Sequence, residues 1–403
     1  MNSIVSFEKK LSISSPTMHG DEQKFVEETL NTNWGNTVGP HLSELEKTAA
    51  DYIGMPYGIA LSSGTAAIHL AIQLVGIQPN ENVFCSDMTS SATVNPVLYE
   101  KGHPIFIDSE YNTWNMDPAA LEQAFKLYPD TRVVILAHVY GTPSRMDEIL
   151  DICKKHNAIL IEDAAESLGA TYKGKQTGSF GKYSAISYDE NKIITCSGGG
   201  MLFTRDEDSV NKVRKWISEA NENSSLSRLD AFDYNYRMSN ILAGIGRGQY
   251  LHLEEHLAQK KAIYQRYQEG LKDLPIILNP YIKGEMEPNY WLSCLLIKPE
   301  GMCKQVLREK DASYTKEPGK TCPIHIMETL AKYNVESRPM WKPMHLQPVY
   351  KTNPFITKNG NDHTHTTDVG SDIFSRGLCL PSDNKMTQEQ QNVVIEIIKE
   401  CFR

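Results

Sequence analysis

The first 250 residues alternate between short apolar runs and longer segments whose apolar residues recur every three or four positions. Residues 132–138 and 158–162 are predicted strands, because each is a short and mostly apolar run. Between them, residues 146–157 form a predicted amphipathic helix, whose apolar residues are Met146, Ile149, Leu150, Ile152 and Cys153. A strand, a crossover helix and a second strand form a βαβ unit, whose strands are parallel. The pattern therefore predicts an α/β domain with helices on both faces of a mostly parallel sheet.

The rest of the chain has a different pattern and predicts a smaller α+β domain. Residues 254–271 form a long, highly charged predicted helix, and residues 291–298 and 378–381 are apolar enough to be strands. Thr387 precedes the last predicted helix, and its spacing to Gln390 is that of a capping box.

This change of pattern sets the predicted domain boundary. We expect a large domain, 1–250, which includes an N-terminal arm, and a small C-terminal domain, 251–403. Two polar stretches, 308–321 and 358–370, are predicted to be surface insertions.

The composition narrows the class of protein. The 403 residues carry a net charge of -9, which argues against a binding surface for nucleic acid or for an anionic membrane. No apolar run approaches the ~20 residues of a membrane span, and the first residues lack the apolar segment of a signal peptide. The eight cysteines show no C-x-x-C spacing, which disfavours a zinc knuckle or a disulfide framework. We therefore expect a cytoplasmic protein with reduced thiols.

A lysine and an aspartate stand where α/β proteins place catalytic groups. Lys192 follows the predicted strand 184–188 and precedes the glycine run 198–200. Asp163 follows the predicted strand 158–162, so its carboxylate is expected at the carboxyl edge of the sheet. A lysine can carry pyridoxal 5'-phosphate (PLP) as a Schiff base, and an aspartate can keep the pyridine nitrogen protonated. Taken singly, they would be a surface lysine and a helix cap; together they predict a PLP site.

Candidate phosphate ligands lie earlier in the chain. The segment Ser62-Ser63-Gly64-Thr65-Ala66-Ala67 opens an apolar predicted helix, whose free N–H groups suit a phosphate. An ordinary Ser/Thr N-cap is the alternative for this segment. Ser187 is a second candidate, although its hydroxyl would equally close a strand end.

Glu166 lies three residues after Asp163. It would bind a ring substituent of the cofactor or contact the substrate, or it would be a solvated acid in the first turn of a helix. The candidate cofactor-binding residues are therefore Gly64, Thr65, Ala66, Asp163, Glu166, Ser187 and Lys192.

Two other patterns carry little weight. The glycines 198–200 follow the lysine instead of opening a helix, and the Gly-x-Gly-x-x-Gly pattern of nucleotide sites is missing. We interpret them as a tight turn. The histidines of Asp362-His363-Thr364-His365 have no third ligand nearby, so we predict no metal site.

Three motifs, in the same order along the chain, resemble those of the DegT/DnrJ/EryC1/StrS sugar aminotransferases. They are Ser-Gly-Thr-Ala-Ala at 63–67, Ile-Glu-Asp-Ala-Ala-Glu-Ser-Leu-Gly-Ala-Thr-Tyr-Lys-Gly-Lys at 161–175 and Asn-Lys-Ile-Ile-Thr-Cys-Ser-Gly-Gly-Gly-Met-Leu at 191–202. Asn-Tyr-Arg-Met-Ser-Asn follows at 235–240. The resemblance extends over nearly the whole chain. It implies a type I aspartate-aminotransferase fold, and a homodimer with the active site between the subunits.

The resemblance also implies roles by position. Lys192 matches the Schiff-base lysine, and Asp163 matches the partner of the pyridine nitrogen. The phosphate-binding positions of the family are matched by Gly64, Thr65, Ser187 and, reaching over from the neighbouring subunit, Asn235. The family also contains sugar dehydratases with a histidine in place of the lysine, so the presence of Lys192 favours transamination.

Within the family, residues 336–345 and 233–237 look most like the bacterial enzymes that aminate a UDP-linked 4-keto-6-deoxy-N-acetylhexosamine. Cations in these segments would pair with a pyrophosphate or with the carboxylate of the amino donor, and aromatic rings would pack against sugar or base. The candidate substrate-binding residues are Arg237, Arg338, Trp341, Lys342 and His345. A buried tryptophan beside a structural Arg-Pro strand is the alternative for the second segment.

One position departs from the family. Ser90 stands where an aromatic residue usually stacks on the cofactor ring, so either another group covers the ring or the affinity for PLP is lower. The resemblance implies transfer of an amino group from L-glutamate to the keto-sugar, giving a 4-amino sugar for surface glycans. The alternatives are a GDP-linked 4-keto-6-deoxyhexose, a 3-keto sugar, or a PLP-binding regulator without catalysis. The intact Lys192 and Asp163 argue against the regulator.

Overall fold

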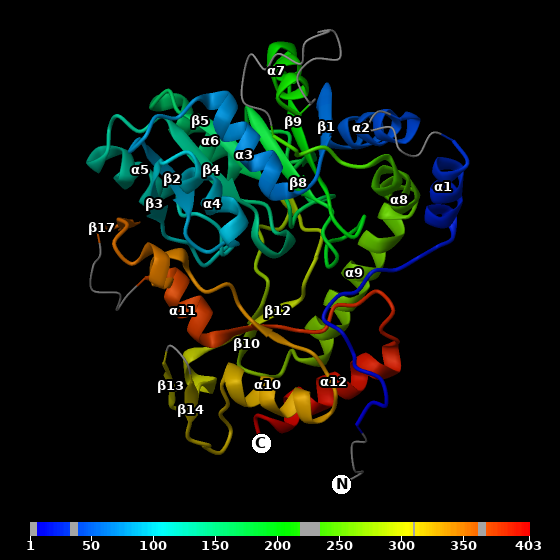
Figure 1. Cartoon of the computed structure of the whole chain (residues 1–403). Helices are drawn as coiled ribbons and strands as arrows, with labels where there is room; N and C mark the ends of the chain where they lie inside the picture. Colours follow the sequence, from blue (N-terminus) through cyan, green and yellow to red (C-terminus); the bar gives the residue numbers. More distant parts are fainter. Residues whose placement is uncertain (1–5, 33–38, 218–233, 309–310, 362–367) are drawn as a thin grey trace.

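The computed structural model describes residues 6–32, 39–217, 234–308, 311–361 and 368–403. Within them, the larger part of the molecule is built on a nine-stranded sheet in the order β1-β9-β8-β5-β4-β2-β3-β16-β17 (Figure 1). The run from β8 to β16 is parallel throughout, which confirms the predicted α/β class. The strands are β1 (Tyr57–Leu61), β2 (Asn82–Ser86), β3 (His103–Ile107), β4 (Val133–Ala137), β5 (Ile159–Asp163), β8 (Tyr183–Ser187), β9 (Gly200–Thr204), β16 (Phe355–Thr357) and β17 (Gly360–Asn361).

The predicted βαβ unit is present, with one end shifted. Strands β4 and β5 pair in parallel and are connected through α6 (Met146–Lys155), whose Met146, Ile149 and Cys153 are buried as predicted. The helix ends two residues earlier than the pattern indicates. Asn157 adopts a φ of 52°, a left-handed conformation in which an α-helix does not continue.

Helices cover both faces of the large sheet. Ile135 of β4 belongs to an apolar cluster with residues of α3 (Gly64–Val75) and α7 (Glu207–Ile217). The next residue, Leu136, belongs to a second cluster with α5 (Pro118–Leu127) and α6. Successive side chains of a strand point to opposite faces, so these clusters are the two halves of a three-layer core.

The smaller part contains a four-stranded sheet in the order β10-β12-β18-β15, in the lower half of Figure 1. Its strands are β10 (Ile276–Leu278), β12 (Cys294–Ile297), β15 (Arg338–Pro339) and β18 (Gly377–Cys379), and its helices are α9 (Leu253–Gly270), α10 (Pro323–Lys332) and α12 (Gln388–Glu400). The predicted strand at 291–298 is confirmed in shortened form as β12, and the one at 378–381 is confirmed as β18, which begins one residue earlier and ends two residues earlier than predicted. The capping box before α12 is also confirmed, with Thr387 and Gln390 bonded in both directions at 2.9 and 3.2 Å.

The remaining elements connect or flank these two sheets. The helices are α1 (Asp21–Leu30), α2 (Pro40–Ile53), α4 (Ser91–Tyr99), α8 (Asn240–Tyr250) and α11 (Val369–Arg376). The short strands are β6 (Thr171–Tyr172), β7 (Lys175–Gln176), β11 (Met286–Glu287), β13 (Gln305–Leu307) and β14 (Ala312–Tyr314). No helix among the described residues is both long and apolar enough to cross a membrane. All eight cysteines are buried free thiols.

Each part contains a segment from the other side of residue 250 in the sequence. Strand β16 follows residue 250 in the chain, yet it pairs in parallel with β3 of the large sheet. Conversely, Leu11 near the N-terminus forms a bridge with Val335 in the smaller part. The division at residue 250 therefore remains a prediction, because segments from each side of it pack on the other.

The predicted surface insertion at 358–370 is confirmed in part for its described residues: Lys358 and Asn359 are exposed, whereas Asp368 and Gly370 are buried. Strand β17 extends the large sheet, and the N–H of Gly370 donates to the buried carboxylate of Asp108 at 3.0 Å. A polar composition does not reveal such contacts, because here the polar groups bond to one another in the interior.

Candidate active site

The carboxyl ends of β1, β2, β4, β5 and β8 meet at one edge of the large sheet and border a cavity of about 250 Å³. Because these strands are all parallel to one another, the residues that follow them come together at that edge. The cavity is lined by Ser62, Ser63, Gly64, Thr65, Ile68, Thr89, Ser90, Ala92, Ala137, His138, Asp163, Ala165, Glu166, Ser187, Asp189, Lys192, Gly198 and Gly199. Six of the eight predicted cofactor ligands lie in this wall, and Asn235 does not. Ala66 lies just behind it, in the first turn of α3.

One end of the cavity is formed by the N-terminus of α3. Ser63 caps this helix, since its Oγ accepts the N–H of Ala66 at 3.0 Å. The backbone is packed too tightly for a side chain here: a Cβ on Gly200 would lie 2.4 Å from the carbonyl carbon of Ser63. A Cβ on Gly64 would lie 3.0 Å from the Cβ of Ser187. The first N–H groups of the helix and the neighbouring hydroxyls thus form a cradle of the kind that binds phosphate.

Asp163 lies at the end of β5, with 7% of its surface exposed. Its Oδ2 accepts a hydrogen bond from the hydroxyl of Thr93 at 2.6 Å, and its Oδ1 accepts the N–H of Ala165 at 3.1 Å. Thr93 donates its single hydroxyl proton to Asp163. Thr89 is therefore the donor in the 2.7 Å contact between the two threonines. The sequence analysis missed both threonines: Thr89 precedes the N-cap of α4, and Thr93 lies in the first turn of that helix.

The amino group of Lys192 lies close to a carboxylate and to an indole ring. Its Nζ lies 4.0 Å from Oε1 of Glu166 and 4.3 Å from the ring centroid of Trp291, over the ring face. Glu166 also accepts hydrogen bonds from the N–H of Tyr140 at 2.8 Å and from the indole of Trp341 at 3.1 Å. Burial raises the pKa of Glu166, and the nearby Lys192 offsets this only in part. Glu166 is therefore a buried acid beside the amino group, not a solvated one.

Trp291 is a site residue that the sequence analysis interpreted only as the start of a strand. Its indole N–H donates to the carbonyl of Asn191 at 2.6 Å, next to Lys192. Its backbone N–H donates to Asn289, which also donates to the carbonyl of Glu166 at 2.9 Å. Tyr290 adopts a φ of 53°, an uncommon conformation for a bulky residue that these contacts maintain.

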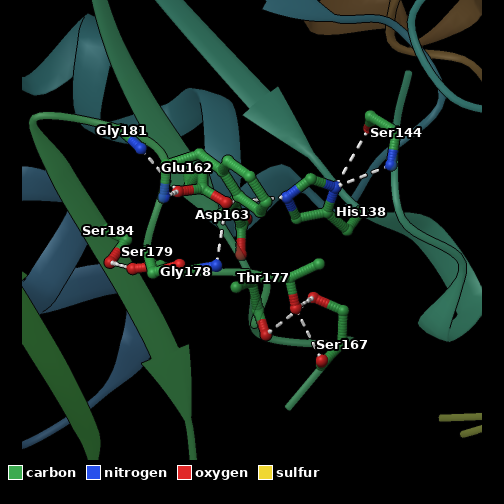
Figure 2. A network of polar contacts seen from close by, with 12 residues as sticks. His138, Ser144, Glu162, Asp163, Ser167, Thr177, Gly178, Ser179, Gly181 and Ser184 are labelled. Atoms are coloured by element: carbon green, nitrogen blue, oxygen red, sulfur yellow. Dashed lines mark hydrogen bonds and ion pairs between the residues drawn. The ribbon is translucent and has the colours of Figure 1, made fainter. Parts of the chain in front are cut away.

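Behind the cavity lies a fully buried polar network around Glu162 (Figure 2). The carboxylate accepts the N–H groups of Gly178 at 2.8 Å, Phe180 at 2.6 Å and Gly181 at 2.6 Å. His138 contacts it through Nε2 at 3.0 Å, and the His138 Nδ1 accepts the N–H of Ser144 at 3.0 Å. The imidazole proton is thus on Nε2, directed at Glu162. Burial raises the pKa of Glu162, but these donors outweigh it and hold the pKa below its usual value.

The five predicted substrate-binding residues do not all lie in one place. Arg338, Trp341 and Lys342 line a second cavity of about 420 Å³, together with Trp291, Tyr140 and Asn191. Arg338 is half-exposed and is paired with Glu336 at 3.0 Å. Trp341 and Tyr140 bond to Glu166 from this side, so Glu166 lies between the second cavity and Lys192.

Three other predicted residues lie outside both cavity walls. His345 is buried, 4% exposed, with its side chain on Asp87 at 2.6 Å. Asn235 is exposed, and the segment after it runs beside the turn that precedes α3, with the N–H of Ser62 donating to the carbonyl of Tyr236 at 2.7 Å. Arg237 forms a bridge with Leu61 at the same place.

Metal ligands were not predicted, and the weak candidate Asp362-His363-Thr364-His365 lies outside the described residues. In the described part of the chain, the side chains of His19, His252 and Glu255 are near enough to one another for a metal. The two imidazoles stack in parallel at 3.8 Å and already contact Glu22, Asp21 and Glu255. Stacked rings do not direct their lone pairs at a common point, so this group is an ion-pair cluster.

The cavity fits PLP by the chemistry of its donors. The cradle before α3 suits the phosphate, the carboxylate of Asp163 suits a protonated pyridine nitrogen, and Lys192 supplies the amino group. No Phe, Tyr or Trp is among the described residues that line it, and His138 contributes the one ring. Ser90 instead caps α4, its Oγ accepting the N–H of Ala92 at 3.3 Å.

Comparisons with known proteins agree with this geometry. A family model described as the DegT/DnrJ/EryC1/StrS aminotransferase family matches residues 16–399. The chain is 40% identical to EpsN of Bacillus subtilis (strain 168), assigned as a pyridoxal phosphate-dependent aminotransferase, over 98% of this chain and 96% of that protein. It is 34% identical to the GDP-perosamine synthase of Caulobacter vibrioides, over 98% of each chain. The structure of Helicobacter pylori PseC, an aminotransferase involved in the biosynthesis of pseudoaminic acid, matches with a TM-score of 0.82 at 19% identity, over 98% of this chain and 99% of that one.

The family match covers almost the whole chain, and the fold agrees with it from the large sheet to α12. The predicted cofactor, PLP, is confirmed by the family. The chain belongs to the DegT/DnrJ/EryC1/StrS aminotransferase family and is a PLP-dependent sugar aminotransferase that acts on nucleotide sugars.

Proposed function

We propose that this enzyme transfers an amino group from L-glutamate to UDP-4-keto-6-deoxy-N-acetylhexosamine, giving the 4-amino sugar for surface glycan synthesis. The observation that carries the proposal is the convergence of Lys192, Asp163 and the N-terminus of α3 on one cavity. These three groups are what a transaminase needs: a proton carrier, a partner for the ring nitrogen and a phosphate anchor.

The residues of this chain have separate tasks in the reaction. PLP, when bound, supplies an electron-withdrawing ring that acidifies the C–H bond beside the amino nitrogen. In the first half-reaction Lys192 Nζ would take the proton from the α-carbon of glutamate and pass it to the cofactor. In the second it would take a proton back from the cofactor and deliver it to the sugar carbon. Asp163 keeps a proton on the ring nitrogen, and the hydroxyl of Thr93 holds its carboxylate in place. Glu166, 4.0 Å from Lys192, would stabilise the ammonium form that Lys192 adopts while it carries the proton within each half-reaction.

The second cavity suits a nucleotide sugar. Its wall is mostly apolar, with Trp291, Met340, Trp341 and Phe374, and such a surface packs against a sugar ring, an acetyl group or a base. Lys342, and Arg338 once it is drawn from Glu336, would pair with the two phosphates. Trp341 and Glu166 would then separate the nucleotide from the reacting carbon.

A GDP-linked 4-keto-6-deoxyhexose is the second candidate substrate. The specific observation in its favour is the 34% identity with a GDP-perosamine synthase along almost the full chain. An apolar cavity of this size does not by itself discriminate an N-acetyl group from a hydroxyl, or a pyrimidine from a purine. A 3-keto sugar is a further alternative of the same class.

A homodimer is part of the proposal. Asn235 is exposed and lies beside the turn that holds the phosphate cradle, but it does not line the cavity of its own chain. A second copy would bring its own Asn235, and with it Arg237, to the cavity of the first. We expect the reaction to occur in the cytoplasm.

The experiment is the absorbance spectrum of the PLP-loaded protein before and after addition of L-glutamate, beside Lys192→Ala. Conversion to the pyridoxamine phosphate form in the wild type alone supports the first half-reaction. An unchanged wild-type spectrum would show that glutamate is not the donor. The second half-reaction is then measured with UDP- and GDP-linked 4-keto-6-deoxy sugars and a 3-keto sugar. Higher kcat/KM for a sugar other than the UDP-linked one would replace the proposed substrate, and any steady turnover excludes a non-catalytic regulator.

A further inference from the structure

We infer that His345 is a positioning residue of the cofactor site: it clamps the turn after β2, so that Thr93 holds the carboxylate of Asp163. His345 was predicted to contact substrate, but it is buried and lies in neither cavity wall. The inference rests on the proposed function, in which Asp163 holds the pyridine nitrogen of PLP. "Positioning" here means that His345 acts only through Asp87 and the turn that follows it.

The clamp consists of three hydrogen bonds to one residue. Asp87 directly follows β2 and is fully buried. Its carbonyl accepts the N–H of Met344 at 2.9 Å, and its Oδ1 accepts the N–H of His345 at 2.9 Å. Its Oδ2 receives the Nδ1–H of His345 at 2.6 Å. Both carboxylate oxygens and the backbone of Asp87 are therefore fixed by two consecutive residues, of which His345 lies 258 positions later in the chain.

The fixed turn carries the residues that hold Asp163. Asp87 leads through Thr89 to Ser90, the N-cap of α4, and Thr93 lies in the first turn of that helix. The N–H of Thr93 donates to the carbonyl of Ser90 at 3.1 Å, and its hydroxyl donates to Asp163 at 2.6 Å. A displacement of Asp87 would move the start of α4 and lengthen this last bond. The contact from Thr89 to Thr93 at 2.7 Å links the turn to Asp163 by a second route.

The imidazole itself is held from the other side. Its ring stacks on Phe355 of β16, with centroids 3.9 Å apart and an angle of 17°. Its Nε2 lies 3.4 Å from the hydroxyl of Ser371 and 3.8 Å from Asp368, both at the start of α11. Burial lowers the pKa of His345, but the carboxylates of Asp87, Asp368 and Asp108 outweigh it and raise the pKa above its usual value. The raised pKa favours the charged imidazole, which makes stronger hydrogen bonds than a neutral one.

This position explains why a histidine is useful here. Only a short side chain with a donor at the Nδ1 position reaches Asp87 while a flat ring fills the space against Phe355. An asparagine places its N–H close to the position of Nδ1, whereas a glutamine places it close to that of Nε2. The two variants remove the ring alike and differ in whether the bond to Asp87 survives.

The experiment compares His345→Asn with His345→Gln in the full-length protein loaded with PLP labelled with nitrogen-15 in the ring. Three quantities are measured for each: the nitrogen-15 chemical shift of the pyridine nitrogen, the dissociation constant of PLP, and the melting temperature of the protein without PLP. We expect the Gln variant to bind PLP about tenfold more weakly and to shift the nitrogen resonance towards the unprotonated value. We expect the Asn variant to stay within about threefold of the wild type, although both variants melt at lower temperature.

The variant Asp163→Ala distinguishes a failure of the proposed function from a failure of the positioning role of His345. If it leaves the nitrogen resonance and the PLP affinity at their wild-type values, the assignment of Asp163 in the proposed function is wrong. If Asp163→Ala changes both quantities while His345→Gln changes neither, the positioning role of His345 is overturned and the proposed function stands. Equal losses of affinity in the Asn and Gln variants would also overturn it, because the ring would then matter and the bond to Asp87 would not.

Discussion

Glu162 and Glu166 lie four residues apart at the end of β5, and both are buried, yet their pKa values move in opposite directions. Burial raises the pKa of each, because a carboxylate loses its hydration. Glu162 is compensated by three backbone N–H groups and by His138, and its pKa is lowered (Figure 2). Glu166 receives one backbone N–H, one indole N–H and a lysine at 4.0 Å, and its pKa is raised.

The difference in pKa indicates that Glu162 has a structural role and that Glu166, four residues later, is available for a role in the reaction. The three backbone donors of Glu162 come from the loop 178–181 and do not change during a reaction, so they stabilise its anionic form throughout. The principal cation near Glu166 is the amino group of Lys192, whose position changes when the lysine releases the cofactor. A carboxylate that depends on a moving partner is able to respond to it, and Glu166 is therefore the better candidate for a catalytic acid or base.

The largest expected effect is on stability. Glu162→Gln keeps the shape but turns an amide NH2 towards N–H donors, so we expect a loss of about 3 kcal/mol in the free energy of unfolding. Glu166→Gln keeps an acceptor for only one of the two N–H donors, which bond to different carboxylate oxygens, and we expect a smaller loss of about 1 kcal/mol. Denaturant titration of both apoproteins measures these values, and similar losses would remove the distinction between the two carboxylates.

The pH dependence sharpens the same comparison. The pKa of Glu162 is lower in the folded state, so its contribution to stability is present above its unfolded pKa of about 4.5 and is lost as the pH falls through the folded value. The pKa of Glu166 is higher in the folded state, so its contribution is present below about 4.5 and is lost as the pH rises through the folded value.

The two Gln variants test these signs. The stability difference between the wild type and Glu162→Gln should shrink when denaturant titrations are repeated towards pH 4. The stability of Glu166→Gln relative to the wild type should increase as the pH rises from 4 to 7. If the two differences change in the same direction, the opposite pKa shifts are refuted.

Asp163, between the two glutamates in the sequence, accepts two hydrogen bonds, as Glu166 does, and gives the next effect. Thr93→Val keeps the shape of the side chain and removes the hydroxyl bond to Oδ2. We expect PLP to bind about fivefold more weakly, which corresponds to one hydrogen bond of about 1 kcal/mol. Spectrophotometric titration with PLP measures this, and Thr89→Val is the control with a smaller expected change because Thr89 reaches Asp163 only through Thr93. An equal effect of both variants would point to a general disturbance of α4.

The parts of the site that follow strands were predictable, and the parts that come from packing were not. Asp163 and Ser187 end apolar runs, and because neighbouring parallel strands end at one edge, the pattern alone places them together. Lys192 is reached from the same edge by a short turn, with its N–H bonded to the carbonyl of Asp189.

Trp291 and Thr93 carry no such signal. Each reaches the site through a contact between segments that the periodicity treats separately, and Trp291 lies a hundred residues from the Asn191 carbonyl that it binds. His345 shows the converse: a residue close to Trp341 and Lys342 in sequence was predicted to share their environment, yet it is buried on Asp87. The sequence analysis gave no account of orientation in this segment, because its short 3-10 turns and its single pair of strand residues have no long periodicity.

The smallest expected effect comes from removing a single donor from Glu166. Trp341→Phe keeps an aromatic ring and loses the indole N–H, so we expect about 0.5–1 kcal/mol less stability and a still higher pKa of Glu166. Trp291→Phe is the matched control, because its indole N–H bonds to a backbone carbonyl and not to a carboxylate. The measurement is the stability difference from the wild type between pH 4 and pH 7. It should widen with pH for Trp341→Phe and stay flat for Trp291→Phe, because only the first change alters how well the Glu166 anion is stabilised. If the two variants behave alike, the count of donors is not what separates Glu166 from Glu162, and the mobility of Lys192 would have to account for the difference alone.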